Sequence, residues 1–435
     1  MTGDEIVALS KKHTISEWAA QGAVDPIPVA RAEGIYFWTP EGKRFIDFNS
    51  QLMCMNIGHS DPRVVQAIQR QAEALCYVTP AGMTTEPRAR LGAKLAEIAP
   101  GDIDVFFFTN GGSEAVENAF KIARAFTGRP KILARYRSYH GATAAAIAAT
   151  GDPRRWSQPP QPGVVRVLDP YHGIERGWDT VDESLRHIEE VIQLEGSQTI
   201  AAFILESVTG TNGILVPPDG YMQGVRALCD KYGILMIVDE VMSGFGRTGA
   251  WFAINHWGVV PDLVTMAKGL TSAYVPLGAV GMRQRIADFF QDKPFPGGLT
   301  YSGHALACAA ALATIGVYEE DRLIERARER GAVMAGLLEE LAARHPCVGA
   351  VRSLGLFGVV ELVRNRSTRE PMAPFNGTSA EMTALATFFR QEGLFTLVRW
   401  NYFFTNPPLT ITDAQLREAF AIIDRGLAVA DLVAR

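Results

Sequence analysis

The sequence has little of what secreted or membrane-spanning proteins are built from. It holds only 5 cysteines in 435 residues, and none forms a Cys-x-x-Cys pair. Cysteines this few, scattered and odd in number predict free thiols in a reducing compartment and argue against a disulfide framework. No uninterrupted apolar run approaches the ~18 residues of a membrane-spanning helix. The cysteines are Cys54, Cys76, Cys229, Cys308 and Cys347.

Charge, histidine spacing and the N-terminus exclude further classes. The net charge is −5, and no basic run with interleaved aromatics occurs, which argues against a nucleic-acid or anionic-membrane partner. The 8 histidines show neither H-x-x-x-H spacing nor grouping with cysteine, so we expect no metal site. Residues 1–5 carry acids and begin no long apolar core, unlike a signal peptide. We therefore predict a soluble cytoplasmic protein.

The sequence contains enough apolar residues to form a large core. These residues make up 47% of the chain, and its length predicts roughly two or three structural units. From about residue 85 to residue 320, short apolar runs alternate with helical patterns, as in a doubly wound parallel sheet. We predict strands at Val105–Phe108, Ile132–Ala134, Val164–Val167, Ala201–Leu205, Ile234–Val238, Leu263–Met266 and Leu277–Val280.

Both ends of the chain predict a second, smaller unit. Near the N-terminus, Ile35–Trp38 and Arg44–Phe48 flank a turn-forming segment, which predicts a hairpin. Near the C-terminus we predict strands at Val348–Val351, Leu356–Val363, Leu394–Val398 and Phe403–Thr405. The fold class is then α/β, with a large domain built on a mostly parallel sheet and a small α+β domain made from both chain ends. We place the N-terminal arm and part of the small domain at 1–60, the large domain at 61–325 and the rest of the small domain at 326–435. The Pro- and Gln-rich segment 152–163 reads as a surface loop.

An acid and a lysine follow two of the predicted buried strands. Asp239 comes directly after Ile234–Val238, and Lys268 follows Leu263–Met266 closely. Taken singly, such an acid is more often a loop residue or helix cap, and such a lysine is more often a surface charge. Together they stand at the strand ends where open α/β sheets bind ligands. An aspartate to hold a pyridinium nitrogen and a lysine to form a Schiff base are what pyridoxal 5′-phosphate (PLP) requires.

A glycine turn upstream offers a site for the phosphate of that cofactor. The predicted strand Val105–Phe108 is followed by Thr109-Asn110-Gly111-Gly112-Ser113 and then by a helical pattern. Glycines let backbone N–H groups approach an anion, the serine adds a hydroxyl donor, and the start of a helix favours negative charge. Alone, such a turn is more often only a tight connection, and it is neither G-x-G-x-x-G nor a P-loop.

Together these segments resemble the class III aminotransferases, the ω-aminotransferase branch of the fold-type I PLP-dependent enzymes. The resemblance runs from about Gly34 to the C-terminal helix. Its most specific stretches are Gly111–Ala115, Tyr139–Gly141, Asp239–Val241, Gly244–Gly249, Ala267–Gly269 and Thr300–His304.

The resemblance implies a role for each matching residue around the cofactor ring. Lys268 would form the Schiff base and later carry a proton between the substrate carbon and the cofactor. Asp239 would pair with the pyridinium nitrogen. Val241 would pack on one face of the ring and Tyr139 on the other, although Tyr139 could instead be a core aromatic.

The phosphate and the rim of the site follow from the same resemblance. Gly112 and Ser113 would hold the phosphate, joined by Thr300 of the partner subunit, so the active unit would be a homodimer or a homotetramer. The alternative for Thr300 is a cap on the helix that starts near His304. Glu206 would belong to the rim of the site or act only as a structural acceptor.

Substrate-facing positions are also implied. Leu52 and Met53 would line the pocket entrance, with core packing as the alternative, and Tyr139 would also contact substrate. Arg399 resembles an arginine that binds substrate carboxylate, although its spacing to the following Pro407-Pro408 is shorter than is usual in the family. Met242 and Ser207 stand where relatives often carry glutamine and proline, and both departures favour an amine, β-amino acid or taurine-like subgroup.

The expected function is a ping-pong aminotransferase. It would move an amino group from an ω-amino acid, β-amino acid or amine to pyruvate or 2-oxoglutarate, both small-molecule partners. An aminomutase or decarboxylase would use the same lysine, aspartate and phosphate site, so it stays an alternative. A non-catalytic relative is disfavoured because Lys268 and Asp239 are both intact.

Overall fold

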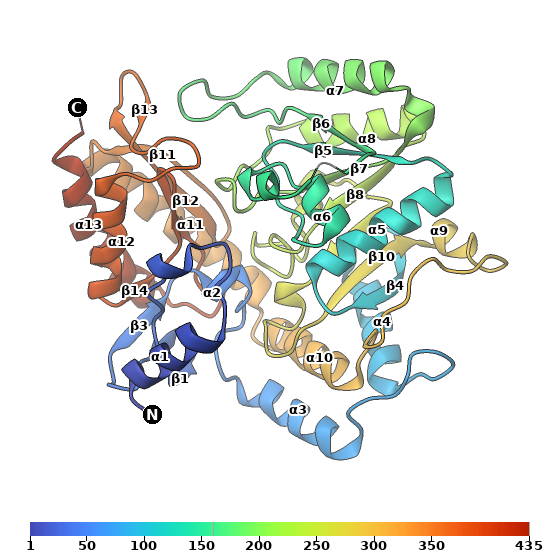
Figure 1. Cartoon of the computed structure of the whole chain (residues 1–435), viewed down its shortest axis with the longest axis horizontal. Coiled ribbons are helices and arrows are strands. Elements are labelled where there is room, and N and C mark those ends of the chain that lie inside the picture. The colour runs from blue at the N-terminus through green and yellow to red at the C-terminus, as the bar shows by residue number, and fades with distance from the viewer. Residues whose placement is uncertain (160, 435) are drawn as a thin grey trace.

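The computed structural model describes residues 1–159 and 161–434 of the protein. Its central feature is a seven-stranded sheet with the order β4-β10-β9-β8-β7-β5-β6 (Figure 1). Strand β10 runs antiparallel to both neighbours, and the other pairings are parallel. Each strand overlaps one predicted from sequence, so the mostly parallel α/β class is confirmed. The strands are β4 (Ile103–Thr109), β5 (Lys131–Arg135), β6 (Val164–Val167), β7 (Ile200–Glu206), β8 (Leu235–Asp239), β9 (Leu263–Met266) and β10 (Gly278–Arg283).

Helices cover both faces of this sheet because its strands are buried on both sides. In β7, Phe203 and Leu205 belong to one apolar cluster, whereas Ala202 and Ile204 belong to another. The second cluster is completed by α5 (Gly112–Thr127), α6 (Ala144–Ala149) and α9 (Gln284–Asp288). The first is completed by α3 (Pro62–Ala74), α4 (Glu86–Ile98), α7 (Val181–Glu195), α8 (Tyr221–Tyr232) and α10 (Ala305–Glu320). This two-sided burial explains why the strands read as continuous apolar runs.

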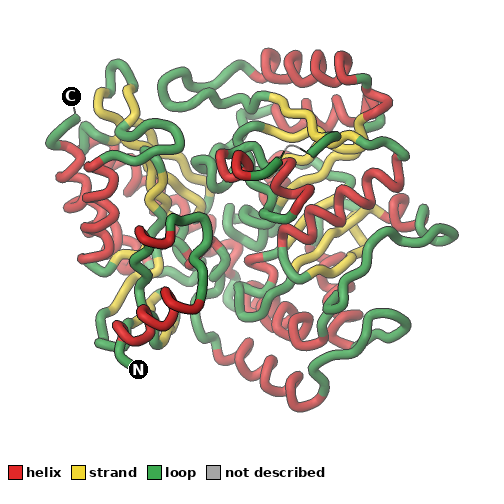
Figure 2. The backbone as a smooth tube through the Cα atoms, viewed as in Figure 1, coloured by secondary structure: helices red, strands yellow, loops and turns green. Residues whose placement is uncertain are grey.

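Two smaller sheets lie beside the large one, in the part of the molecule that carries both termini (Figures 1 and 2). The first has the order β1-β2-β3-β14, and its last strand comes from the C-terminal part of the chain. The second has the order β11-β12-β16-β15, with β13 paired to β12. The predicted N-terminal hairpin is confirmed by the antiparallel pairing of β2 with β3. The strands are β1 (Arg31–Glu33), β2 (Tyr36–Trp38), β3 (Arg44–Asp47), β11 (Val348–Leu354), β12 (Phe357–Asn365), β13 (Glu370–Pro371), β14 (Leu394–Phe395), β15 (Val398–Arg399) and β16 (Tyr402–Thr405).

The prediction of a single strand at Leu394–Val398 is wrong. The chain changes sheets within this segment: Leu394 pairs with Ile46 of β3, whereas Val398 pairs with Phe403 of β16. Between them, the Thr396 hydroxyl donates to the Phe404 carbonyl over 2.6 Å. The segment is mostly apolar because both of its halves are at least partly buried, and apolarity alone does not reveal a change of strand partner.

The remaining helices are α1 (Gly3–His13) and α2 (Ser50–Met53) near the N-terminus and α11 (Leu323–Arg344), α12 (Ala380–Gln391) and α13 (Asp413–Asp431) near the C-terminus. Helix α13 starts as expected, with Thr412 and Gln415 forming a capping box. Within the described part of the chain, no helix is both long and apolar enough to cross a membrane.

Candidate active site

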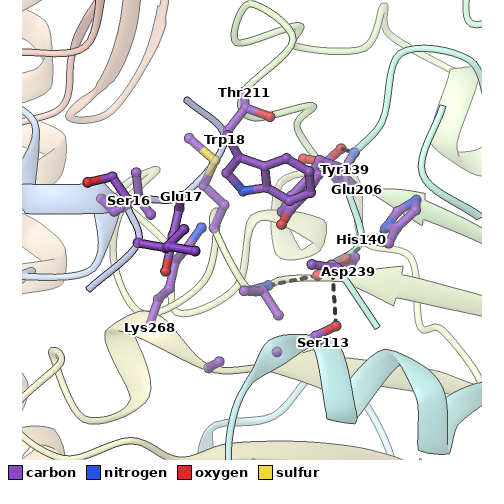
Figure 3. A pocket seen from close by; sticks show the side chains of 18 residues that line it. Ser16, Glu17, Trp18, Ser113, Tyr139, His140, Glu206, Thr211, Asp239 and Lys268 are labelled. Atoms are coloured by element: carbon purple, nitrogen blue, oxygen red, sulfur yellow. Dashed lines mark hydrogen bonds and ion pairs between the residues drawn. The ribbon is translucent and has the colours of Figure 1, made fainter. Parts of the chain in front are cut away.

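A cavity of 640 Å³ lies at the carboxyl ends of β7, β8 and β9. It contains Asp239 and Lys268, and Figure 3 shows their side chains entering it from different elements. This is the edge of the sheet at which the sequence argument placed a ligand. The wall is formed by Ile15, Ser16, Glu17, Trp18, Leu52, Gly112, Ser113, Tyr139, His140, Gly141, Ala142, Glu206, Thr211, Asp239, Val241, Met242, Ala267 and Lys268.

Asp239 is held in a fixed position by three donors. Its Oδ2 lies 2.7 Å from Nδ1 of His140, and its Oδ1 accepts from the Val241 N–H and the Thr265 hydroxyl, each over 3.1 Å. Because an ionised carboxylate only accepts, we infer that Nδ1 of His140 carries the proton. Both side chains are buried, so the carboxylate is oriented before any ligand arrives.

Lys268 follows β9 in a strained turn. Its φ is 42°, a left-handed value that residues other than glycine rarely adopt. The next residue, Gly269, is held by a hydrogen bond, because the Tyr318 hydroxyl donates to its carbonyl over 2.8 Å. Burial lowers the pKa of the Lys268 amine, because charge is costly away from water. The site therefore favours a neutral, nucleophilic amine.

Glu206 stands beside Asp239 at the end of the neighbouring strand. The two residues are directly paired in the register of β7 and β8. Oε1 of Glu206 accepts from the Tyr139 N–H over 3.1 Å, and Oε2 accepts from the Gly210 N–H over 2.7 Å. Burial raises the pKa of Glu206, so this carboxyl holds protons more tightly than an exposed one. Its present contacts fix the segment that carries Tyr139.

The predicted phosphate turn is confirmed as a strand–turn–helix connection. Helix α5 begins at Gly112, directly after Gly111. The Ser113 hydroxyl accepts from the N–H groups of Ala142 and Thr143 over 3.1 and 3.0 Å and lies 2.7 Å from the Thr143 hydroxyl. The start of a 16-residue helix and several hydroxyl and N–H groups thus converge at one end of the cavity.

Leu52 and Met53, which were predicted to line the pocket entrance together, lie in the irregular helix α2 and point in different directions. Helix α2 contains positive φ angles at Ser50, Gln51 and Met53, and the buried Asp47 accepts from the Gln51 N–H over 2.8 Å. Leu52 is 56% exposed and lines the cavity. Met53 is 1% exposed and belongs to an apolar cluster with Met242, so the structure places it in core packing, the alternative given above, and not in the cavity wall. The irregular turn reverses the direction of adjacent side chains, which sequence spacing does not reveal.

Two further predicted residues lie outside this wall. Arg399 is half-buried behind it, with Nη2 3.3 Å from Oδ2 of Asp152 and its guanidinium 4.3 Å from the Trp400 ring centre. Thr300 is exposed, and its carbonyl accepts from the Tyr77 hydroxyl over 2.8 Å. Neither residue contributes to the cavity of its own chain, so their roles stay predictions.

Sequence reasoning missed Arg154. Its guanidinium lies 3.6 Å from the centre of the Tyr139 ring and 5.8 Å from that of Trp18, both of which line the cavity. Asp152, 1% exposed, binds Nε and Nη2 of Arg154, and Thr211 accepts from Nη2 over 2.9 Å. The prediction that 152–163 is a surface loop is therefore wrong at its first residue, because Asp152 is buried. The spacing Asp152-x-Arg154 was the only sequence signal that could have indicated this ion pair.

The N-terminal residues of the wall and His140 were also missed as site residues. Ile15, Ser16, Glu17 and Trp18 come from the segment after α1, which folds back over the cavity mouth (Figure 3). Nothing local in that segment indicates such a return. His140 stood in a quoted motif, yet its contact with Asp239 depends on two strands that are distant in sequence.

Comparison with known proteins identifies the family. A model of the class III aminotransferases matches residues 18–427. The chain belongs to this family. It is therefore a transaminase of fold-type I.

Individual members of the family are similar to this chain along almost its full length. Putrescine–pyruvate aminotransferase from Pseudomonas aeruginosa is 35% identical over 91% of this chain and 89% of its own. The solved taurine:2-oxoglutarate aminotransferase from Bifidobacterium kashiwanohense, in complex with PLP and glutamate, is 42% identical with a TM-score of 0.96, covering 99% of both chains. An (S)-enantioselective ω-transaminase from Thermomicrobium roseum is 38% identical with a TM-score of 0.92, covering 98% of both chains.

Class III aminotransferases use PLP, and the cavity of this aminotransferase fits that cofactor. The amine of Lys268 and the buried carboxylate of Asp239 share one cavity, and a helix start with a serine hydroxyl closes one end of it. Gly112 is also required by packing, because a Cβ there would lie 2.9 Å from both methyl groups of Val241. The residues present therefore match a planar, anionic, carbonyl-bearing group.

The burial of Lys268 predicts a pH-dependent stability of the cofactor-free protein. The pKa of this lysine is lowered in the folded state, whereas the unfolded chain exposes it with its ordinary value of 10.5. Between the two pKa values the unfolded state binds more protons, so the free energy of unfolding rises with pH. We expect Lys268→Met to stabilise the cofactor-free protein at neutral pH, by an amount that shrinks as the pH approaches 10.5.

Urea unfolding midpoints at several pH values measure this difference. The exposed Lys12 provides the matched control, because Lys12→Met removes a lysine that folding does not bury. A Lys268→Met advantage that stays constant across this pH range would show that the amine is not held neutral by burial.

Proposed function

We propose that Lys268 is the covalent anchor and proton carrier of this transaminase, with Asp239 as the partner of the cofactor nitrogen. PLP supplies an electron-withdrawing ring that makes a substrate C–H bond acidic. Support comes from the lowered pKa of the Lys268 amine, which can take up a proton at Nζ and return it to a neighbouring carbon. Asp239, held by His140, keeps a fixed negative charge opposite a ring nitrogen.

The proposed cofactor contacts follow the same geometry. Ser113 and the N–H groups at the start of α5 would bind the phosphate, and the two faces of the ring would lie against Val241 and Tyr139. Glu206 would fix Tyr139 through its backbone N–H rather than contact substrate. The names of the relatives support transamination over the aminomutase or decarboxylase alternative, which would need no second keto acid.

The single observation that carries the proposed donor class is Arg154. Its guanidinium is stacked on Tyr139 and oriented by Asp152, and among the described residues its Nη1 has no hydrogen-bond partner. An oriented guanidinium with a free edge is suited to a carboxylate or sulfonate. We infer that the donor is a small ω-amino acid whose distal acidic group binds Arg154, as taurine, β-alanine or 5-aminovalerate would. The acceptor, pyruvate or 2-oxoglutarate, would place its carboxylate there in the second half-reaction.

Replacing Arg154 tests this assignment. Losing one charge-assisted pair costs about 1.5–3 kcal/mol, so Arg154→Gln should raise KM for taurine and β-alanine roughly 10- to 100-fold. KM for the uncharged 1-phenylethylamine should change less than about 3-fold, because that amine makes no such pair. Steady-state kinetics with both donor types measure the ratio, which a general folding defect would not alter.

Arg399→Gln is the matched control, because Arg399 contacts the same Asp152 from behind the wall. We expect this variant to weaken anionic donors less than Arg154→Gln does. If Arg399→Gln instead raises KM for anionic donors more strongly, the anion-binding role belongs to Arg399.

The proposal includes a subunit interface. Thr300 is exposed, and the aromatic rings of Tyr77, which contacts it, and of the adjacent Tyr301 are 36% and 56% exposed and lie 5.8 Å apart. Such a surface favours a protein partner, and a second copy would bring Thr300 to the phosphate of its neighbour. We therefore expect sedimentation to give a dimer or tetramer and Thr300→Val to weaken PLP binding. A monomer with full activity would contradict the interface. The five free cysteines support a reducing, cytoplasmic location.

A further inference from the structure

A second cavity lies behind the wall of the active site. It consists of two hollows of 160 and 450 Å³, which share five lining residues. Both volumes far exceed the ~15 Å³ that a single water needs, so the space suits a larger guest. The shared residues, which define this second cavity, are Arg137, Tyr171, His172, Asn212 and Phe375.

The wall between the two cavities is thin, because neighbouring residues face opposite sides of it. Thr211 lines the active-site cavity, whereas Asn212 lines the second. Arg399 contacts Asp152 behind Arg154, whereas Trp400 lines the second cavity and lies 4.6 Å from Phe375, measured between ring centres.

The second cavity holds polar donors that protein contacts leave unused. Asn212 is 3% exposed, and its Nδ2 has no hydrogen-bond partner among the described residues. Arg137 donates from Nε to the Tyr171 carbonyl over 3.0 Å, and neither of its terminal nitrogens makes a hydrogen bond within the described part of the chain. Arg155, in the outer hollow, donates from Nε to the Gly151 carbonyl over 3.2 Å and makes no other side-chain hydrogen bond to residues that the structure describes. A buried amide donor without a partner is costly, which favours a guest that accepts.

The acids of the same cavity do not cancel these donors. Glu361 is bound by Arg352 over 2.7 Å and by the Tyr171 hydroxyl over 3.0 Å, so its charge is already paired. Asp169 accepts from the backbone N–H of Arg137 over 3.1 Å, and its Oδ1 lies 3.5 Å from Nε of the same residue, so it pairs with Nε and not with the terminal nitrogens. Glu175 is exposed and lies at the margin.

We propose that the second cavity binds a small carboxylate anion. One carboxylate would accept from the terminal nitrogens of Arg137 and from Nδ2 of Asn212, and the short carbon chain would lie against Tyr171 and Phe375. The acceptor-only chemistry of a carboxylate matches the unused donors of Arg137 and Asn212. This site is separate from the donor site at Arg154 and does not depend on which amine the enzyme uses.

Succinate binding to reduced holoenzyme tests the proposal. Borohydride reduction of the bond between Lys268 and PLP keeps the cofactor in place and blocks amino transfer, and titration calorimetry then reports binding alone. We expect the wild-type protein and Arg154→Gln both to bind succinate. Asn212→Asp, which keeps the shape of the side chain and adds a negative charge, should weaken this binding at least 10-fold, as should Arg137→Gln.

A matched control is Glu175→Gln, which removes an acid at the margin and should leave binding equal or tighter. Cofactor absorbance and the unfolding temperature verify that each variant is folded. Succinate binding that is lost in Arg154→Gln and kept in Asn212→Asp would place the anion in the active site only and overturn the proposal. Absence of binding to the wild-type protein at millimolar succinate would overturn it as well.

Discussion

The amine of Lys268 lies in a cavity at the end of β9, where loss of water contact makes its charge costly. Most features of the site follow from that constraint. The cost of a buried ammonium lowers the pKa of the lysine and favours the neutral form that can attack a carbonyl carbon. The same loss of water contact would strengthen the proposed pairing of Asp239 with a cationic ring nitrogen. A parallel sheet supplies both positions, because the carboxyl ends of β8 and β9 meet at one edge.

The second constraint is that Asp152 is fully buried and must be paired. Arg154, stacked on the cavity residue Tyr139, pairs with it, and so does Arg399, so one carboxylate determines the position of two guanidinium groups. The proposed anion sites on the two sides of this wall therefore share a structural element.

Much of this arrangement could be predicted from sequence because it depends on local pattern. The apolar runs before Asp239 and Lys268 predicted two strand ends. Because the two strands are parallel neighbours, both residues lie at the same edge of the sheet. The phosphate turn at Gly112 was equally local. Met53 and Leu394–Val398 could not be placed correctly, since one depends on a left-handed turn and the other on a change of sheet. Arg154 was missed for a similar reason, because its contact with Tyr139 joins segments whose proximity only the folded chain creates.

The most direct test of the central claim is a single half-reaction followed by cofactor absorbance. The holoenzyme is mixed with taurine or β-alanine in the absence of any keto acid, and 2-oxoglutarate or pyruvate is added afterwards. The account predicts that the absorbance band of bound PLP bleaches with the donor and returns with the keto acid, and that Lys268→Ala binds the cofactor yet shows neither change. A band that no amine or ω-amino acid bleaches, or a Lys268→Ala variant that turns over normally, would contradict it.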